Sequence, residues 1–239
     1  VCHCLLVETD RGLVLIDTGL GTQDYLHTQQ RLGSLLTKFG AIVPDIHLSA
    51  FHQIQRLGYS LDDVKHIFVS HLDFDHAGGI SDFPNATVHV LASEFNATQS
   101  LSLQGKNRYK TEQFKYHRYW NFAEQADGEA WFNLQKVKGL PLFQDEILMV
   151  PLIGHTLGHS AIAVKKQDGW ILFCGDAYFS HLELNPKNSL RALDLTERLL
   201  AEDNQQRLHN LKQLQYLAQH EPSIELICAH DPVEFNRYQ

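Results

Sequence analysis

One short stretch of the chain gathers most of the residues that could do chemistry. In residues 67–79, three apolar residues precede four potential metal ligands, which are His71, Asp73, Asp75 and His76. Imidazole and carboxylate groups are the side chains that bind divalent first-row metals. Alternate residues of an extended backbone share a side, so the first three ligands can face one way while His76 turns to the other. Because one ion cannot readily take all four, the spacing predicts two adjacent metals. The alternative is a polar surface loop after a strand.

The same arrangement, a strand that ends in a polar residue, recurs three times further along the chain. Each time an apolar run stops and a histidine or an aspartate follows, and these residues are His155, Asp176 and His230. One such residue alone is more often structural than functional. Four sites of this kind in one chain indicate a shared metal centre built at the carboxyl ends of strands.

Hydrophobic patterning and turn residues predict the elements that must position these side chains. Strands are expected at 1–8, 12–17, 66–70, 87–91, 146–150, 160–165, 170–174 and 224–228, and helices at 49–58, 92–100 and 190–219. Residues 22–48 are interpreted as a helix and a long loop. The turn that begins at Asp17 ends a strand, so Asp17 either orients neighbouring loops or is a plain turn residue.

Residues 104–135 differ from the rest because they combine many aromatic residues with polar ones. This segment is too aromatic for a disordered linker. We interpret it as a helical insertion whose aromatic residues line a pocket, form a local core or make a dimer contact. With no linker or repeat in the sequence, residues 1–239 are expected to form a single domain that contains this insertion.

Composition narrows the class of partner. The net charge of −8 argues against a nucleic-acid partner, and no apolar run approaches the length of a membrane span. A signal peptide is not visible, and the start at Val1 directly in a strand is compatible with missing native residues. Four scattered cysteines do not predict a disulfide scaffold, which favours a reducing, cytoplasmic setting. Cys2 and Cys4 are interpreted as buried thiols or, less simply, as metal donors. The fifteen histidines add weight to metal chemistry.

The order of the motifs resembles that of the metallo-β-lactamase superfamily. The motifs are His71-x-Asp73-x-Asp75-His76, Gly154-His155-Thr156-x-Gly158-His159-Ser160, Gly175-Asp176 and His230, with the turn Asp17-Thr18-Gly19 before them. The stretch from Ser70 to Gly79 and the ending Ala229-His230-Asp231-Pro232 are most similar to lactonase-like hydrolases, including those that open acyl-homoserine lactones. The resemblance implies an α/β fold, the four-layer αββα sandwich, and a site with two divalent metal ions at one edge.

The resemblance also implies roles for individual residues. The first ion would be held by His71, Asp73 and His155, and the second by Asp75, His76 and His230, with Asp176 bridging the two. A hydroxide between the metals would attack the carbonyl of an ester or lactone, with Asp75 orienting it and moving a proton to the leaving oxygen. His159 would hydrogen-bond a ligand or the backbone. Tyr178 is either a catalytic electrophile or a packing residue, because the family's tyrosine is expected one position later.

Asp73 departs from the family, which has histidine at this position. A further carboxylate should make the first ion a weaker Lewis acid, and it shifts preference from zinc toward iron or manganese. Zinc remains the first expectation for the metal, and a hydrolase remains the first hypothesis for the function. Because of Asp73, a di-iron oxidoreductase related to the flavodiiron branch is the second hypothesis, and a non-catalytic metal-binding protein is the third. For the hydrolase we expect a small-molecule substrate and no nucleic-acid or membrane partner. A homodimer is one assembly that this expectation allows.

Overall fold

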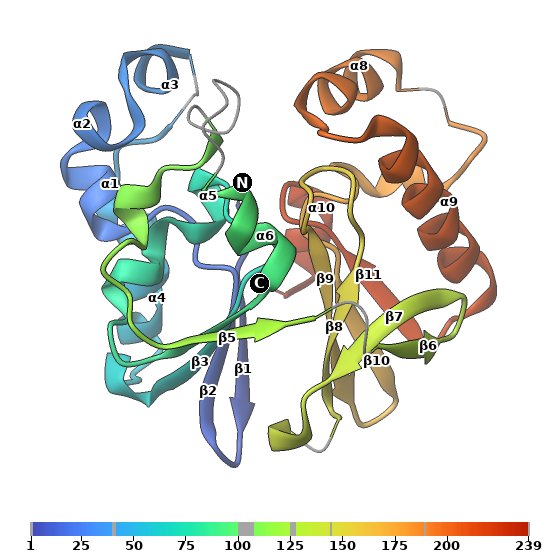
Figure 1. Ribbon diagram of the computed structural model, residues 1–239, viewed down its shortest axis with the longest axis horizontal. Helices are drawn as coiled ribbons and strands as arrows, with labels where there is room; N and C mark the ends of the chain where they lie inside the picture. The colour runs from blue at the N-terminus through green and yellow to red at the C-terminus, as the bar shows by residue number, and fades with distance from the viewer. Residues whose placement is uncertain are drawn as a thin grey trace. The chain divides into compact units, whose positions relative to one another are not determined.

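The computed structural model describes residues 2–39, 42–99, 108–124, 128–143, 145–188 and 190–238 (Figure 1). The chain forms two compact units. The N-terminal unit comprises Cys2–Val90 and Asn96–Asn121, and the C-terminal unit comprises Leu91–Phe95 and the described residues from Phe122 on. Each unit is built around one sheet.

The sheet of the N-terminal unit has the strand order β1-β2-β3-β4-β5. Its strands are β1 (Leu5–Thr9), β2 (Gly12–Ile16), β3 (Val64–Phe68), β4 (Thr87–Leu91) and β5 (Trp120–Ala123). The first two form an antiparallel hairpin with Leu5 opposite Ile16, whereas β2, β3 and β4 run parallel. Continuous apolar runs are typical of parallel strands buried on both faces. In agreement, β2 from Leu13 to Ile16 is buried throughout.

Short helices join these strands. They are α1 (Thr22–Leu26), α2 (Thr28–Leu32), α3 (Ser34–Phe39), η1 (Ile46–Leu48), α4 (Ala50–Arg56), η2 (Leu61–Asp63), α5 (Phe74–Ala77), η3 (Gly78–Asp82), α6 (Ala92–Ala97) and η4 (Thr111–Gln113). The helix expected at 49–58 is confirmed as α4, and Ser49 caps it by accepting a hydrogen bond from the backbone nitrogen of His52. In 22–48, the described residues form three short helices and a 3-10 turn, more helix than expected. Gly33 (φ 90°) separates α2 from α3, because its left-handed backbone ends a helix.

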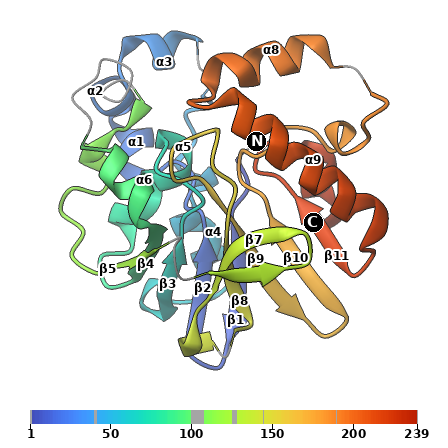
Figure 2. The same cartoon turned by 45° about the vertical axis from the view of Figure 1, so that its right-hand side comes forward.

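The sheet of the C-terminal unit has the order β11-β10-β9-β8-β7-β6 (Figure 2). Its strands are β6 (Glu129–Trp131), β7 (Leu134–Gly139), β8 (Ile147–Pro151), β9 (Ser160–Lys166), β10 (Gly169–Phe173) and β11 (Ile224–Ile227). Neighbours are antiparallel except β10 and β11, which are parallel. The hairpin predicted around Gly169 is confirmed by β9 and β10. It follows that β8, β10 and β11 run in the same direction and end at the same edge of this sheet.

Helices of the C-terminal unit are η6 (Pro141–Phe143), η7 (His181–Leu184), α8 (Arg191–Leu200), α9 (Asn204–His220), α10 (Pro232–Phe235) and η8 (Asn236–Tyr238). The single helix expected over 190–219 is two helices, because the backbone leaves the helical region at Ala201 and the Asp203 side chain caps α9 by accepting from the Gln206 nitrogen at 2.9 Å. Among the helices of the described ranges, none is long and apolar enough to cross a membrane.

The helical insertion predicted for 104–135 is wrong for the residues that the structure describes. Arg108 is helical, whereas residues 109–124 and 128–135 hold one 3-10 turn, β5, β6 and the start of β7, and 104–107 and 125–127 lie outside the described residues. Trp120 and Phe122 alternate along β5, and Trp131 ends β6. Aromatic residues fit a pleated, half-buried surface, so this segment follows strand propensity. The single-domain assignment stays a prediction.

Candidate metal centre

The carboxyl ends of β2 and β3 build the ligand loop of the N-terminal unit. The two strands are parallel neighbours, so their carboxyl ends meet at one edge of the sheet. Asp17 follows β2, and its backbone nitrogen donates to the Phe68 carbonyl at 2.8 Å. The loop from Ser70 to His76 follows β3 directly. The candidate ligands of this unit therefore lie at the carboxyl ends of its parallel strands, where the sequence pattern predicts them.

Asp17 fixes the orientation of the ligand loop. Its Oδ1 accepts from the Ser70 nitrogen at 2.7 Å, and its Oδ2 accepts from the Ser70 hydroxyl at 2.7 Å. The same Oδ2 lies 2.7 Å from Nδ1 of His76, and both side chains are fully buried. A proton on Nδ1 shared with this carboxylate leaves Nε2 of His76 as the basic nitrogen. Of the two interpretations of Asp17, the structure supports the orienting one.

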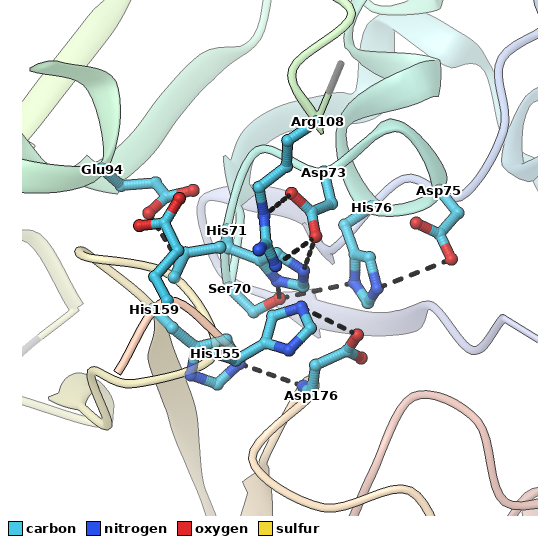
Figure 3. Close-up of polar contacts among 12 residues, drawn as sticks. Ser70, His71, Asp73, Asp75, His76, Glu94, Arg108, His155, His159 and Asp176 are labelled. Carbon is cyan, nitrogen blue, oxygen red and sulfur yellow. Dashed lines mark hydrogen bonds and ion pairs between the residues drawn. The ribbon is translucent and has the colours of Figure 1, made fainter. Parts of the chain in front are cut away.

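Two histidine–aspartate pairs lie in this loop (Figure 3). Nε2 of His71 is 3.4 Å from Oδ2 of Asp73, and Nε2 of His76 is 3.9 Å from Oδ2 of Asp75. Two ligand atoms bound to one tetrahedral zinc at about 2.1 Å stand roughly 3.4 Å apart. The spacing of both pairs is thus close to that of ligands which share an ion.

Asp73 also forms an ion pair with Arg108. Nε of Arg108 donates to Oδ1 of Asp73 at 2.7 Å, and Nη2 donates to Oδ2 at 2.8 Å (Figure 3). The two side chains are mostly buried, with exposed fractions of 10% and 13%. Two parallel hydrogen bonds of this kind form the strongest geometry of an arginine–carboxylate pair.

The C-terminal unit contributes a second cluster at the carboxyl ends of β8, β10 and β11. His155 lies in the loop after β8, Asp176 follows β10 and His230 follows β11. Oδ2 of Asp176 is 3.4 Å from Nε2 of His155, and its Oδ1 is 3.1 Å from Nε2 of His230. The two carboxylate oxygens therefore face different imidazoles.

Buried contacts hold the loop that carries His155. The carboxylate of Glu94, in α6, accepts from the Thr156 hydroxyl at 2.7 Å and from the Gly158 nitrogen at 3.0 Å. A Cβ at Gly158 would lie 2.1 Å from the Glu94 nitrogen, and one at Gly154 (φ 140°) would lie 2.4 Å from the Arg207 nitrogen. Both glycines of this motif are thus required by close backbone approach.

His159 orients the backbone that carries Asp176. Its Nδ1 lies 3.1 Å from the carbonyl of Leu152, and its Nε2 accepts from the Asp176 nitrogen at 3.0 Å. These two contacts fit one tautomer, with the proton on Nδ1. The expected hydrogen bond of His159 to the backbone is confirmed.

Tyr178 occupies the core of the C-terminal unit. Its side chain is fully buried, and its hydroxyl donates to both carboxylate oxygens of Glu234, at 3.1 and 3.2 Å. Burial, together with the charge of nearby groups, holds the pKa of Tyr178 well above its usual range. Its neighbour Phe179 contacts His155 and His230 edge-on, with ring centroids 6.1 and 5.2 Å away. The packing interpretation of Tyr178 is the one that the structure supports.

The amino-terminal cysteines lie ahead of β1, although the strand was expected to begin at residue 1. The described residues form no disulfide, and burial raises the pKa of Cys4 to about 12, which keeps that thiol protonated. Sγ of Cys2 donates to the backbone carbonyl of Asp75 at 2.6 Å and lies within 4.8 Å of ligand atoms of Asp75 and His76. Cys2 is thus placed beside two predicted ligands, and Cys4 interacts electrostatically with Asp17 and His76.

Sequence reasoning missed Arg108 and Glu94. Both are far along the chain from the residues that they hold, and both lie in segments with no motif. One signal for Arg108 was available: a carboxylate at a position where the family has a neutral imidazole requires a nearby positive charge if it is to be buried. Glu94 had no such signal.

The donors of the two units fit divalent metal ions by their chemistry and by their spacing. Within each unit, imidazole nitrogens and carboxylate oxygens face one another, and Asp17 and His159 orient members of the set from behind.

Comparison with known proteins identifies the family of the chain. The sequence model of the metallo-beta-lactamase superfamily matches residues 1–218. A probable metallo-hydrolase of Mycobacterium tuberculosis is 39% identical over 238 residues, which cover 97% of this chain and 75% of the relative. An N-acyl homoserine lactonase of Bacillus thuringiensis is 28% identical over 180 residues, which cover 74% of this chain and 64% of the relative.

Solved structures show the same fold. An N-acyl homoserine lactone hydrolase with N-hexanoyl-L-homoserine at its catalytic metal centre has a TM-score of 0.71 and 24% identity, over 98% of this chain and 82% of that one. A dizinc quorum-quenching lactonase has a TM-score of 0.61 and 18% identity, over 97% of this chain and 72% of that one. These likenesses confirm the predicted α/β fold class, with two mixed sheets flanked by helices. The chain belongs to the metallo-β-lactamase superfamily and is a metal-dependent hydrolase.

Proposed function

We propose that the enzyme hydrolyses an ester or lactone bond in a small molecule of the acyl-homoserine-lactone type. The support is the lactonase among the sequence relatives and the lactonases among the structures of the same fold. A hydrolase accounts for these relatives, whereas neither a di-iron oxidoreductase nor a non-catalytic protein is favoured by them. The chain contains no G-x-S-x-G motif, so an activated water is the simplest nucleophile.

Two divalent ions, zinc first among them, are the cofactors in this proposal. The first would be held by His71, Asp73 and His155, and the second by Asp75, His76 and His230, with Asp176 between them. The observation that carries the proposal is the carboxylate of Asp176, whose oxygens face His155 and His230 separately. A histidine of each set then shares the same carboxylate, as a dinuclear site requires.

Bound ions would supply an activated water and would stabilise the negative charge that develops on the carbonyl oxygen. The chain's own residues do the rest. Asp75, on α5, accepts the proton of the attacking water and returns it to the leaving oxygen. Its side chain is about one quarter exposed, at 26%, so it can exchange that proton with bound substrate. Asp17 keeps His76 in one tautomer throughout, because its carboxylate holds the Nδ1 proton.

The setting of the enzyme is part of the same proposal. We place it in a reducing, cytoplasmic environment, in keeping with four cysteines that form no disulfide within the described residues. The partner is a small molecule, not a nucleic acid or a membrane, and a homodimer is allowed.

Metal analysis combined with turnover tests the proposal. Purified protein should contain two zinc ions per chain and should hydrolyse N-hexanoyl homoserine lactone or p-nitrophenyl acetate. Asp176→Asn should lose bound metal and turnover together, whereas Asp168→Asn, in the exposed turn between β9 and β10, should change neither. A metal-loaded protein that cleaves no ester or lactone would contradict the substrate class. A wild-type protein that binds no stoichiometric metal would contradict the metal-dependent mechanism.

A further inference from the structure

The ion pair between Asp73 and Arg108 is built into the ligand loop and is not a surface contact. Asp73 lies at the N-cap position of α5, where an aspartate usually accepts a hydrogen bond from the first turn, yet its side chain caps nothing. Both of its oxygens instead receive donors from Arg108. The two side chains are nearly 90% buried, so water screens this pair little.

Asp73 can serve Arg108 and a metal ion at the same time. An ionised carboxylate has about four lone-pair sites, and Arg108 occupies two of them. Oδ2 of Asp73 also lies 3.4 Å from Nε2 of His71, close to the roughly 3.4 Å expected between two ligands of one zinc. The arginine therefore fixes the carboxylate with Oδ2 beside Nε2 of His71, at the spacing of two ligands of one ion.

Charge distinguishes this pair from a simple extra carboxylate. Asp73, Asp75 and Asp176 bring three negative charges to the predicted ligand set, where a histidine at position 73 would leave two. The guanidinium of Arg108, which stays protonated at any physiological pH, cancels one of the three. The ligand set together with Arg108 then has the same net charge as a set with a neutral imidazole at position 73.

We propose that Asp73 and Arg108 together replace that imidazole: Asp73 is the ligand, and Arg108 is a positioning residue that fixes its oxygen and cancels its charge. This inference rests on the proposed metal-dependent function. It also revises the expectation that Asp73 alone shifts the first site from zinc toward iron or manganese. With Arg108 in place, the first ion experiences the net charge of a three-histidine site.

A double-mutant cycle in metal affinity tests the coupling. The four proteins are wild type, Asp73→His, Arg108→Gln and the double variant. Each is stripped of metal and titrated with zinc against a chelator, and the metal-free proteins are melted in parallel. With Asp73 present, Arg108→Gln should lower the affinity for the weaker ion about tenfold, because the ligand loses the partner that orients it. In the Asp73→His background, the same change should raise the affinity, because Arg108 would otherwise be a buried cation beside another cation.

A reversal of sign between the two backgrounds is the expected result. An effect of Arg108→Gln that has the same sign in both backgrounds would overturn the inference. So would a lower melting temperature with unchanged zinc affinity, since that is the behaviour of a purely structural ion pair. Arg118→Gln, an exposed arginine of the same segment, is the matched control and should alter neither readout. Should Arg108→Gln fail to fold, Arg108→Lys can be used, because lysine keeps the positive charge but cannot donate two parallel hydrogen bonds. This variant should lower zinc affinity less than the loss of Asp73 does.

The outcomes separate this inference from the function on which it rests. Wild-type protein that binds no zinc overturns the proposed function and this inference with it. Zinc bound by all four proteins with additive effects overturns the inference alone. A reversal of sign in a protein that cleaves no ester or lactone supports the pair and overturns only the substrate class.

Discussion

Asp17→Asn is the sharpest test of how the ligand loop is oriented. Asparagine keeps the size of the side chain and tolerates the left-handed backbone of position 17 (φ 52°), so the turn itself should survive. The carboxamide can still accept from Ser70, but it no longer offers His76 Nδ1 a charged acceptor at 2.7 Å. A hydrogen bond to a charged group contributes about 1.5–3 kcal/mol. Loss of such a partner typically costs about 10–100-fold in metal affinity, which is about 1.4–2.7 kcal/mol.

The assay for Asp17→Asn is zinc titration of metal-free protein against a chelator, with circular dichroism as a check on folding. We expect the weaker of the two zinc affinities to fall about 10–100-fold at unchanged secondary structure. Asp10→Asn, in the exposed turn between β1 and β2, is the control and should bind zinc as wild type does. Unchanged zinc affinity in folded Asp17→Asn would refute the argument that this carboxylate sets the tautomer of His76.

Three further predictions concern residues outside the ligand set. Burial, and secondarily the charge of a neighbouring histidine, lower the pKa of His89 from 6.5 to about 3, so the unfolded chain takes up this proton first as the pH falls. Stability conferred by neutral His89 is therefore complete above about pH 6.5 and decreases toward pH 3. The free energy of unfolding in urea should be about 2 kcal/mol lower at pH 5 than at pH 7 from this group, and His89→Phe should remove that dependence. Tyr178→Phe should lower the unfolding free energy by about 1–3 kcal/mol, because it leaves buried Glu234 with one donor fewer, while kcat/KM stays at the wild-type value. A loss of turnover in a folded Tyr178→Phe protein would return the tyrosine to the mechanism. Gly158→Ala should destabilise the fold by about 1–3 kcal/mol, since the new methyl group would meet the Glu94 backbone at 2.1 Å, and zinc titration should show weaker binding as the His155 loop shifts.

Strands were the part of the fold that the sequence predicted well. Short apolar runs bounded by glycine, proline and aspartate mark their own ends, and each expected strand from 12–17 to 224–228 has its counterpart. The prediction of a helical insertion at 104–135 was wrong because its aromatic residues suit a helix face and a strand face alike. Only pairing with neighbouring strands decides between the two. The break between α8 and α9 was missed because Asp203 resembles an ordinary polar helix residue until its side chain is seen to cap α9.

Positions of the candidate ligands could be predicted because a strand that ends in a histidine or aspartate is a local pattern. The residues that hold these ligands in place could not be predicted. The ion pair with Arg108 joins residues 35 positions apart, and Glu94 reaches Gly158 across 64. No periodicity connects such residues, since only the path of the chain through space brings them together. Tyr178 shows a different limit: a resemblance suggested a catalytic role as one alternative, and only the structure shows that its hydroxyl is buried against Glu234.

The contacts of Glu94 have a consequence for the order in which the chain can fold. Leu91–Phe95 belongs to the C-terminal unit although the sequence on either side of it belongs to the other unit. During synthesis this segment emerges before Thr156 and Gly158 exist, so the Glu94 carboxylate must stay in water until they arrive. The N-terminal sheet can thus assemble early, while the loop that carries His155 is secured late. A ribosome stalled before Thr156 should present the segment from Leu91 to Phe95 open to proteolysis, and one stalled well beyond it should not.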